Sequence, residues 1–293
     1  MYELIQVSEH SYYVQSPAKI GIVELDAGEV VLIDSGSDKD AGRKLRQILE
    51  GKSWKLRAIY NTHSNADHIG GNKYLQNQYG CKIFAPGIEA DFTRHPLLEP
   101  SFLYGGFPPK ELRHKFLLAQ ESNAESLRDE DLPSGLQSLA LPGHFFDMVG
   151  FKTGEGVVFL ADCLSSEQSL NKYQISFVYD VAKYLETLET VKTMKAEIFV
   201  PAHAEATNNI APLAQKNIEK VQEIGEKILE LCREPIIFEK LLQGLFNDYA
   251  LAMDFEQYVL VGSTVRSYLS WLKDGGKLEI IFENGQLLWK TLA

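Results

Sequence analysis

The stretch NTHSNADHIGG, residues 61–71, holds two histidines and an aspartate within six positions. Imidazole and carboxylate groups are common metal ligands, so this crowding predicts a metal site. The spacing differs from the HExxH helix of zinc proteases, in which two histidines four positions apart share one helical face. Because side chains alternate along an extended backbone, we expect His63, Asn65 and Asp67 to project to one side. Gly70-Gly71 then allows a tight turn that brings His68 inward.

Hydrophobic segments deliver further candidate ligands elsewhere in the chain. The segment LRAIY, residues 56–60, is a predicted buried strand that leads into the first stretch. Three later segments of the same kind also end in His or Asp, giving His144, Asp162 and His203. Loops that follow rigid strands are where α/β folds place their binding and catalytic groups. The sequence therefore predicts that these loops meet in one site.

This ordered set resembles the metallo-β-lactamase-fold superfamily, whose first motif is H-x-H-x-D-H. The resemblance covers roughly residues 10–205 and implies an α/β fold, a four-layer αββα sandwich. An asparagine replaces the second histidine of the motif. The matching positions are His63, Asn65, Asp67 and His68, then Gly143-His144, Ala161-Asp162 and Ala202-His203, with Asp34 in LIDSG as the aspartate behind the ligands.

The resemblance implies two metal ions that share one carboxylate. The first ion takes His63, position 65, His144 and Asp162. The second takes Asp67, His68, His203 and the same Asp162, and Asp67 and Asp162 also have catalytic roles. An amide oxygen is a harder and weaker donor than an imidazole nitrogen, so Asn65 weakens the first site or shifts it from zinc towards iron or manganese. We expect one or two divalent ions, with zinc favoured.

The charges of such a site predict hydrolysis. Two divalent ions, two aspartates and a bridging hydroxide sum to about +1, and a water near pKa 7 on such ions is a nucleophile. A positive pocket in an acidic protein favours anions. The expected activity is metal-dependent hydrolysis of a small anionic ester, thioester or phosphoester.

Two other functions remain open from the sequence. His63, His144 and Asp162 form the two-His, one-carboxylate set of non-haem iron oxygenases, as in the persulfide dioxygenase branch of the superfamily. Alternatively, the protein binds a metal or ligand without catalysis, its site having decayed at Asn65. Iron content with oxygen uptake would favour the first alternative, and metal binding no tighter than millimolar would favour the second.

Residues 1–207 are expected to form the catalytic domain, with strands and helices in the same order twice. Within it, residues 91–135 fit neither a helix nor a strand pattern and hold several prolines and aromatics. We interpret them as a lid or substrate segment. The candidate substrate-binding residues are Arg94, Tyr104 and His114 of this segment and Phe145 and Phe146 beside His144.

Residues 208–293 predict a small C-terminal domain of helices ending in a β-hairpin around Asn284-Gly285, similar to a winged helix. Acidic residues outnumber basic ones there, which favours packing or a homodimer over DNA binding. The net charge of the chain, −11, argues against nucleic acid or an anionic membrane as partner. The three scattered cysteines and the absence of a signal-peptide pattern or an apolar run of about 20 residues predict a cytoplasmic protein.

Overall fold

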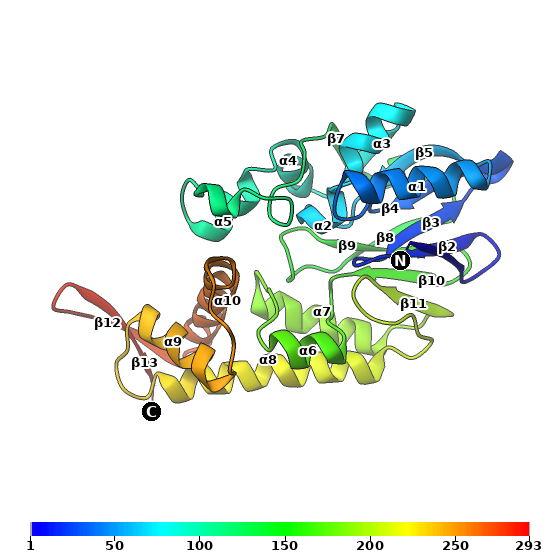
Figure 1. Cartoon of the computed structure of the whole chain (residues 1–293). Coiled ribbons are helices and arrows are strands. Elements are labelled where there is room, and N and C mark those ends of the chain that lie inside the picture. The colour runs from blue at the N-terminus through cyan, green and yellow to red at the C-terminus, as the bar shows by residue number, and fades with distance from the viewer. Residues whose placement is uncertain (1, 293) are drawn as a thin grey trace.

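The computed structural model describes residues 2–292 and stacks two β-sheets between two layers of helices (Figure 1). The first sheet has seven strands in chain order, β1 to β7, and the second has four in the order β11-β10-β9-β8. The strands of the first sheet are β1 (Glu3–Gln6), β2 (Ser11–Gln15), β3 (Ile20–Glu24), β4 (Glu29–Ile33), β5 (Lys55–Tyr60), β6 (Lys82–Ala85) and β7 (Ala124–Ser126). Those of the second are β8 (Leu136–Ala140), β9 (Val149–Thr153), β10 (Val157–Ala161) and β11 (Ile198–Pro201).

Burial on both faces explains the continuous hydrophobic runs of the central strands. In β4, Val30 and Leu32 face a core beneath the outer helices, while Val31 and Ile33 face the core between the two sheets. The helices over the first sheet are α1 (Lys39–Gly51) and α3 (Asn72–Tyr79), and those over the second include α6 (Glu167–Tyr173) and α7 (Val181–Thr193). This arrangement confirms the predicted αββα sandwich.

The C-terminal residues continue the helical layer of the second sheet. The long helix α8 (Ala211–Leu231) packs along α7 and then reaches α9 (Phe238–Asp248) and α10 (Phe255–Asp274). The hairpin of β12 (Leu278–Glu283) and β13 (Gln286–Thr291) follows, with Asn284 and Gly285 both at positive φ in its turn, as their sequence predicts. One hydrophobic cluster runs from Leu141 to Leu278, so packing is continuous across residue 207.

The segment 91–135 is more regular than the sequence indicated. It contains part of α4 (Glu89–Arg94), all of α5 (Leu98–Tyr104) and the edge strand β7. Pro100 is compatible with α5 because it lies in the first turn, where a backbone N–H has no partner within the helix.

Helix α6 was not predicted from the sequence. Ser166 caps it by accepting a hydrogen bond from the Ser169 backbone N–H at 3.1 Å.

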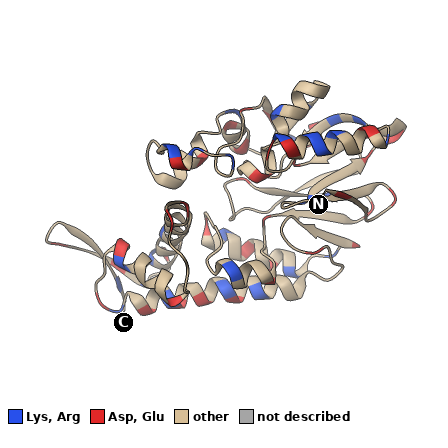
Figure 2. Cartoon of the chain, viewed as in Figure 1, with Lys and Arg blue, Asp and Glu red and all other residues tan. Residues whose placement is uncertain are grey.

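Charged residues of both signs alternate along the outer helices (Figure 2). Figure 2 shows Lys and Arg interspersed with Asp and Glu along α1 and α8, while the sheets carry few of either. Among residues 2–292, none of the helices is both long enough and apolar enough to span a bilayer. Cys81, Cys163 and Cys232 are all buried and free, as expected for core residues.

Candidate metal centre

Strand ends bring the candidate ligands together as predicted. His63 follows β5, His144 follows β8, Asp162 follows β10 and His203 follows β11. Their ligand atoms fall into two groups, in each of which all atoms lie within 4.8 Å of one another. One group is His63, His144 and Asp162, and the other is Asp67, His68, Asp162 and His203. Asp162 belongs to both groups, in agreement with the sharing that the resemblance implies.

The expectation of an extended motif was wrong at Asp67. Residues Ala66–Ile69 form a short helix, α2, because the backbone carbonyl of Asn65 accepts the N–H of His68 at 2.9 Å. Asp67 and His68 therefore project from a helical turn. Gly70 also has a helical backbone with φ −61° rather than a turn that requires glycine. Its role is close approach, since a Cβ there would lie 2.3 Å from the backbone of Ser37.

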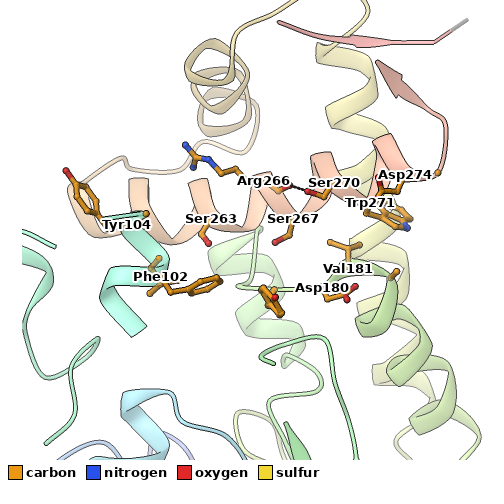
Figure 3. Close-up of a pocket in the computed structure, with 15 residues that line it drawn as sticks. Phe102, Tyr104, Asp180, Val181, Ser263, Arg266, Ser267, Ser270, Trp271 and Asp274 are labelled. Carbon is orange, nitrogen blue, oxygen red and sulfur yellow. Dashed lines mark hydrogen bonds between the residues drawn. The ribbon is translucent and has the colours of Figure 1, made fainter. Parts of the chain in front are cut away.

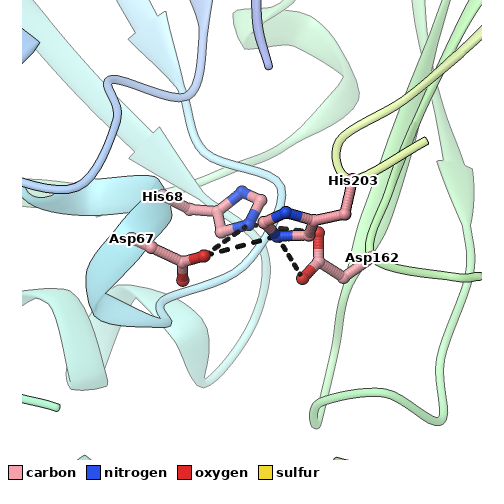
Figure 4. A group of neighbouring side chains, drawn as sticks. All are labelled: Asp67, His68, Asp162 and His203. Carbon is pink, nitrogen blue, oxygen red and sulfur yellow. Dashed lines mark ion pairs between the residues drawn. The ribbon is translucent and has the colours of Figure 1, made fainter. Parts of the chain in front are cut away.

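The second group of ligands is tightly packed (Figure 4). Nε2 of His203 lies 3.1 Å from Oδ2 of Asp162 and 3.3 Å from Oδ2 of Asp67. Nε2 of His68 lies 3.1 Å from Oδ1 of Asp162. Four side chains from three separate loops thus direct ligand atoms at one small volume.

Asp34 fixes the tautomers of two histidines from behind, as expected. Its Oδ2 accepts the Nδ1–H of His68 at 2.8 Å and the hydroxyl proton of Thr62 at 2.8 Å. With its proton committed there, the Thr62 oxygen accepts the Nδ1–H of His63 at 2.9 Å. Both imidazoles are therefore left with an unprotonated Nε2, the form in which histidine binds metals.

Backbone carbonyls do the same for the other two histidines. Nδ1 of His144 lies 3.1 Å from the Phe177 carbonyl oxygen, and Nδ1 of His203 lies 3.0 Å from that of Pro17. A carbonyl can only accept, so Nδ1 is the protonated nitrogen in each ring. In the neutral form, all four imidazoles therefore present an Nε2 lone pair to the centre.

Buried ligand atoms without hydrogen-bond partners support a metal ion. Among the described residues, Nε2 of His63, Nε2 of His68 and Oδ1 of Asp162 are fully buried and lack a hydrogen bond. Buried polar atoms are normally satisfied, so three orphans at one place call for an ion. With the lone pairs already aligned, the residues fit one or two divalent cations.

The carboxylates create a field that favours positive charge. Asp162 and Asp67 raise the pKa of His203 to about 10 against the opposing effect of burial. Burial lowers the pKa of His68, but Asp162, Asp67 and Asp34 together raise it well above its usual value. In contrast, burial keeps the pKa of His63 well below its usual value. The field is therefore strongest at the second group, where both carboxylates lie.

Asn65 lies at the edge of the first group. Its Oδ1 is 3.2 Å from Nε2 of His144, and its Nδ2 donates to Oε1 of Glu99 at 2.7 Å. Glu99 comes from α5 and is only 5% exposed. A second buried glutamate, Glu89, accepts hydrogen bonds from the backbone and hydroxyl of Ser64. Burial raises the pKa of Glu99 well above its usual value and that of Glu89 to about 7.

A cavity of about 330 Å³ opens beside the ligands. His144, Asp162 and His203 form one side of it. Gln257, Leu260 and Val261 of α10 line it as well, so the C-terminal region contributes to this cavity. No lysine or arginine is among the described residues that line it.

None of the five expected substrate residues lines this cavity. Phe145 is buried against His63, with ring centroids 6.4 Å apart, and Phe146 packs on Tyr179 with centroids 4.1 Å apart and the rings tilted by 34°. Arg94 binds Asp91 and the Ala124 carbonyl. His114 pairs with Glu256 at 3.3 Å.

Tyr104 lines a larger groove of about 980 Å³ between α5 and α10. Figure 3 shows Tyr104 and Phe102 of α5 near Ser263 and Arg266 of α10. None of the candidate metal ligands lines this groove. The roles of these five residues in substrate binding therefore stay a prediction.

Sequence reasoning missed the residues that touch the ligands from distant segments. In the sequence, Glu99 is one charged residue within the irregular segment, and Gln257 and Leu260 lie in a stretch with only a helical pattern. Their positions depend on how α5 and α10 pack, and no local sequence pattern predicts that packing. Phe177 and Pro17 act through backbone carbonyls, which every residue has.

Comparison with known proteins agrees with this geometry. A family model described as the metallo-beta-lactamase superfamily matches residues 15–203. The chain therefore belongs to the metallo-beta-lactamase superfamily, which confirms the resemblance.

Curated relatives match over shorter stretches. The chain is 30% identical over 139 residues to a hydroxyacylglutathione hydrolase from Thiobacillus denitrificans, covering 47% of this chain and 43% of that protein. It is 40% identical over 68 residues to a protein of the same name from Hyphomonas neptunium, covering 23% of this chain and 25% of that protein. The chain thus spans less than half the length of these relatives.

Solved structures match the whole chain. A metallo-beta-lactamase family protein from Thermus thermophilus gives a TM-score of 0.73 at 19% identity, with 100% of this chain and 98% of that chain covered. A beta-lactamase domain protein from Burkholderia ambifaria gives a TM-score of 0.72 at 15% identity, with 99% of this chain and 94% of that chain covered. These similarities establish that other proteins share the fold, the C-terminal region included. At such low identities they do not indicate a substrate.

Proposed function

We propose that the protein is a zinc-dependent hydrolase of a small thioester or carboxylic ester. The observation that carries the proposal is the pair of ligand groups that share Asp162, with a cavity opening directly onto three of their members. The names of the curated relatives, hydroxyacylglutathione hydrolases, support a thioester substrate over a phosphoester.

A bound divalent ion would supply a water of lowered pKa and would polarise the carbonyl of the substrate. The chain's own residues would position the reacting groups. Asp162 lies between the two groups and is largely buried, its side chain 12% exposed. Asp67 is 35% exposed and so is the carboxylate that can take a proton from the attacking water and return it to solvent.

The cavity favours a neutral group on the substrate. Its described lining combines apolar side chains with uncharged donors such as Ser165, Ser169 and Gln257. Away from the metal ligands, the described lining offers no lysine or arginine with which an anionic group could pair. We therefore place the acyl group in this cavity and any anionic part of the substrate outside it.

The test is a hydrolysis series on the metal-loaded protein, with neutral acyl thioesters, the matching carboxylic esters and phosphodiesters. We expect the thioesters and esters to be hydrolysed, and Asp67→Ala to lose at least about a hundredfold in kcat, as expected for a group acting in proton transfer. Asp40→Ala, at an exposed acidic residue on α1, is the matched control and should retain activity.

The acyl group itself can be tested within the same series. Leu260→Phe reduces the cavity and should raise KM for longer acyl chains more than for acetyl, without changing metal content. Hydrolysis of none of the three classes by a fully metal-loaded sample would show that the proposed function is wrong.

Oxygen chemistry is a second candidate because His63, His144 and Asp162 form a compact two-His, one-carboxylate group. It requires iron in the protein as purified and oxygen uptake that depends on substrate. Zinc with no oxygen uptake excludes it.

A further inference from the structure

We propose that Glu99 is a positioning residue that orients the Asn65 amide, so that the amide oxygen and not its NH2 group faces the first metal site. This site is defined by His63, His144 and Asp162. Glu99 comes from α5, far from the ligand motif in sequence, and nothing in the motif itself requires it. The inference concerns metal binding and holds independently of the substrate.

The first observation is that Asn65 does not make the hydrogen bond expected at its position. It is the N-cap residue of α2, where an asparagine side chain usually accepts a bond from a backbone N–H of the first turn. Here the side chain makes no cap bond. Its Nδ2 instead donates to Oε1 of Glu99 at 2.7 Å.

The second observation is a contact between two acceptors. Nε2 of His144 is unprotonated because Nδ1 donates to the Phe177 carbonyl at 3.1 Å. Oδ1 of Asn65 lies 3.2 Å from that same Nε2. In the neutral tautomer with its proton on Nδ1, neither atom carries a proton, so this contact joins two acceptors. Two converging lone pairs are the arrangement that a shared cation stabilises.

An asparagine amide can rotate by half a turn with little change in shape, which exchanges its oxygen and nitrogen. In the rotated orientation Nδ2 would donate to Nε2 of His144 and occupy the lone pair that a metal needs. That orientation would also set the amide oxygen against the carboxylate of Glu99. While Glu99 is ionised it can only accept, so two acceptors would repel in the rotated state, and the carboxylate favours the orientation that keeps the first site open.

Burial makes this contact effective. Glu99 is 5% exposed, so water cannot readily replace either partner of its bond to Asn65. Outer partners of metal ligands typically change metal affinity by roughly 10–100-fold when they are removed. We expect removal of Glu99 to give a change at the lower end of this range, because the amide that it orients is a weak ligand.

The experiment measures zinc affinity at each site in a buffered zinc series, with the visible spectrum of the cobalt-loaded protein as a second readout. Glu99→Leu keeps the volume and removes the acceptor. We expect it to weaken the first site by roughly tenfold, with the second site unchanged. Glu99→Gln, whose oxygen can still accept, should lie between Glu99→Leu and the wild type. Ser101→Ala, on the same helix, is the control and should change neither site.

A double-mutant cycle separates positioning from simple structural support. If Glu99 acts through the amide, Glu99→Leu should have no further effect on the first site in an Asn65→Ala background. Three results would overturn the proposal: an equal loss in both backgrounds, an equal loss at both sites, or a first-site affinity within twofold of the wild type. A wild type that binds only one ion, even at millimolar zinc, would overturn it as well.

Discussion

Asn65 occupies the position at which the superfamily motif carries its second histidine, and the structure shows what the amide does there. Its oxygen faces His144, and its nitrogen is held by Glu99. The amide therefore can complete the first metal site, but with a weaker donor than imidazole. The second site has two histidines and two carboxylates, which make a full tetrahedral shell.

Asn65→His should raise zinc affinity at the first site and leave the second nearly unchanged. An imidazole there would restore a nitrogen donor, and its other nitrogen would donate to the same Glu99 carboxylate. Metal stoichiometry of both proteins in a buffered zinc series measures the effect. Equal affinity of the two sites in the wild type would show that the amide is a full ligand and that this account of Asn65 is wrong.

Glu89 shows a second residue-level effect, on stability. Its pKa in the folded protein is about 7, above the ordinary 4.5, because it is buried. The folded state therefore binds the Glu89 proton more tightly than the unfolded state does. This contribution to stability is complete below pH 4.5 and is lost as the pH rises through about 7.

Glu89→Gln removes this titration while keeping an oxygen that accepts from Ser64. Relative to the wild type, the variant should gain stability as the pH rises from 4.5 to about 7 and show a constant difference above that. Urea unfolding of the chelator-treated proteins at several pH values measures the difference, and other titrating groups cancel between them. A difference that does not vary with pH would contradict the assigned pKa.

At the scale of elements, α2 depends on close contact with the loop after β4. The backbone of Gly70 lies against Ser37, where a Cβ would be 2.3 Å from a backbone carbonyl. A Cβ at position 70 would push the backbone of α2 away from the loop that holds Ser37. That shift would move Asp67 and His68, which lie on α2. The glycine is thus needed for close packing rather than for an unusual φ angle.

Gly70→Ala should destabilise the protein by about 1–3 kcal/mol and weaken the second metal site. Gly51→Ala is a matched control, because Gly51 ends α1 and has open space around it. It should be neutral or stabilise by up to about 1 kcal/mol. Thermal unfolding with and without zinc compares the two, and an equal effect of both variants would show that the contact at Gly70 is unimportant.

Most elements could be predicted because each has a local signature. The burial of β4 on both faces, the Asp38 cap of α1 and the Asn284-Gly285 turn are all visible in the sequence. The ligands were also predictable, since each follows a hydrophobic strand.

What could not be predicted depends on contacts between distant elements. The helical turn at Asp67 was missed because four residues are too few to show a period. Glu99 was missed because its burial follows from how α5 packs on the ligand loop.

At the scale of the whole molecule, the C-terminal region is part of the same core as the αββα sandwich. Ile218, Val221 and Ile224 of α8 are buried in the cluster that contains Leu188 of α7. Helix α10 also lines the cavity beside the ligands. Residues 208–293 thus stabilise the second helical layer and shape the site.

A chain that ends at residue 207 should therefore fail to fold as a stable unit, because it would expose the apolar face of α7. Solubility and thermal unfolding of the truncated chain measure this. A soluble truncated chain with a cooperative transition would show that residues 1–207 form an independent domain.

Metal analysis of protein purified without added metal, combined with a thioester assay on the same sample, tests the central claim most directly. We predict at least one tightly held zinc per chain, a second that binds more weakly, and activity that chelation abolishes and zinc restores. Iron with substrate-dependent oxygen uptake would instead favour an oxygenase. Metal binding no tighter than millimolar, with no hydrolysis at saturating zinc, would contradict the assignment of a catalytic metal centre.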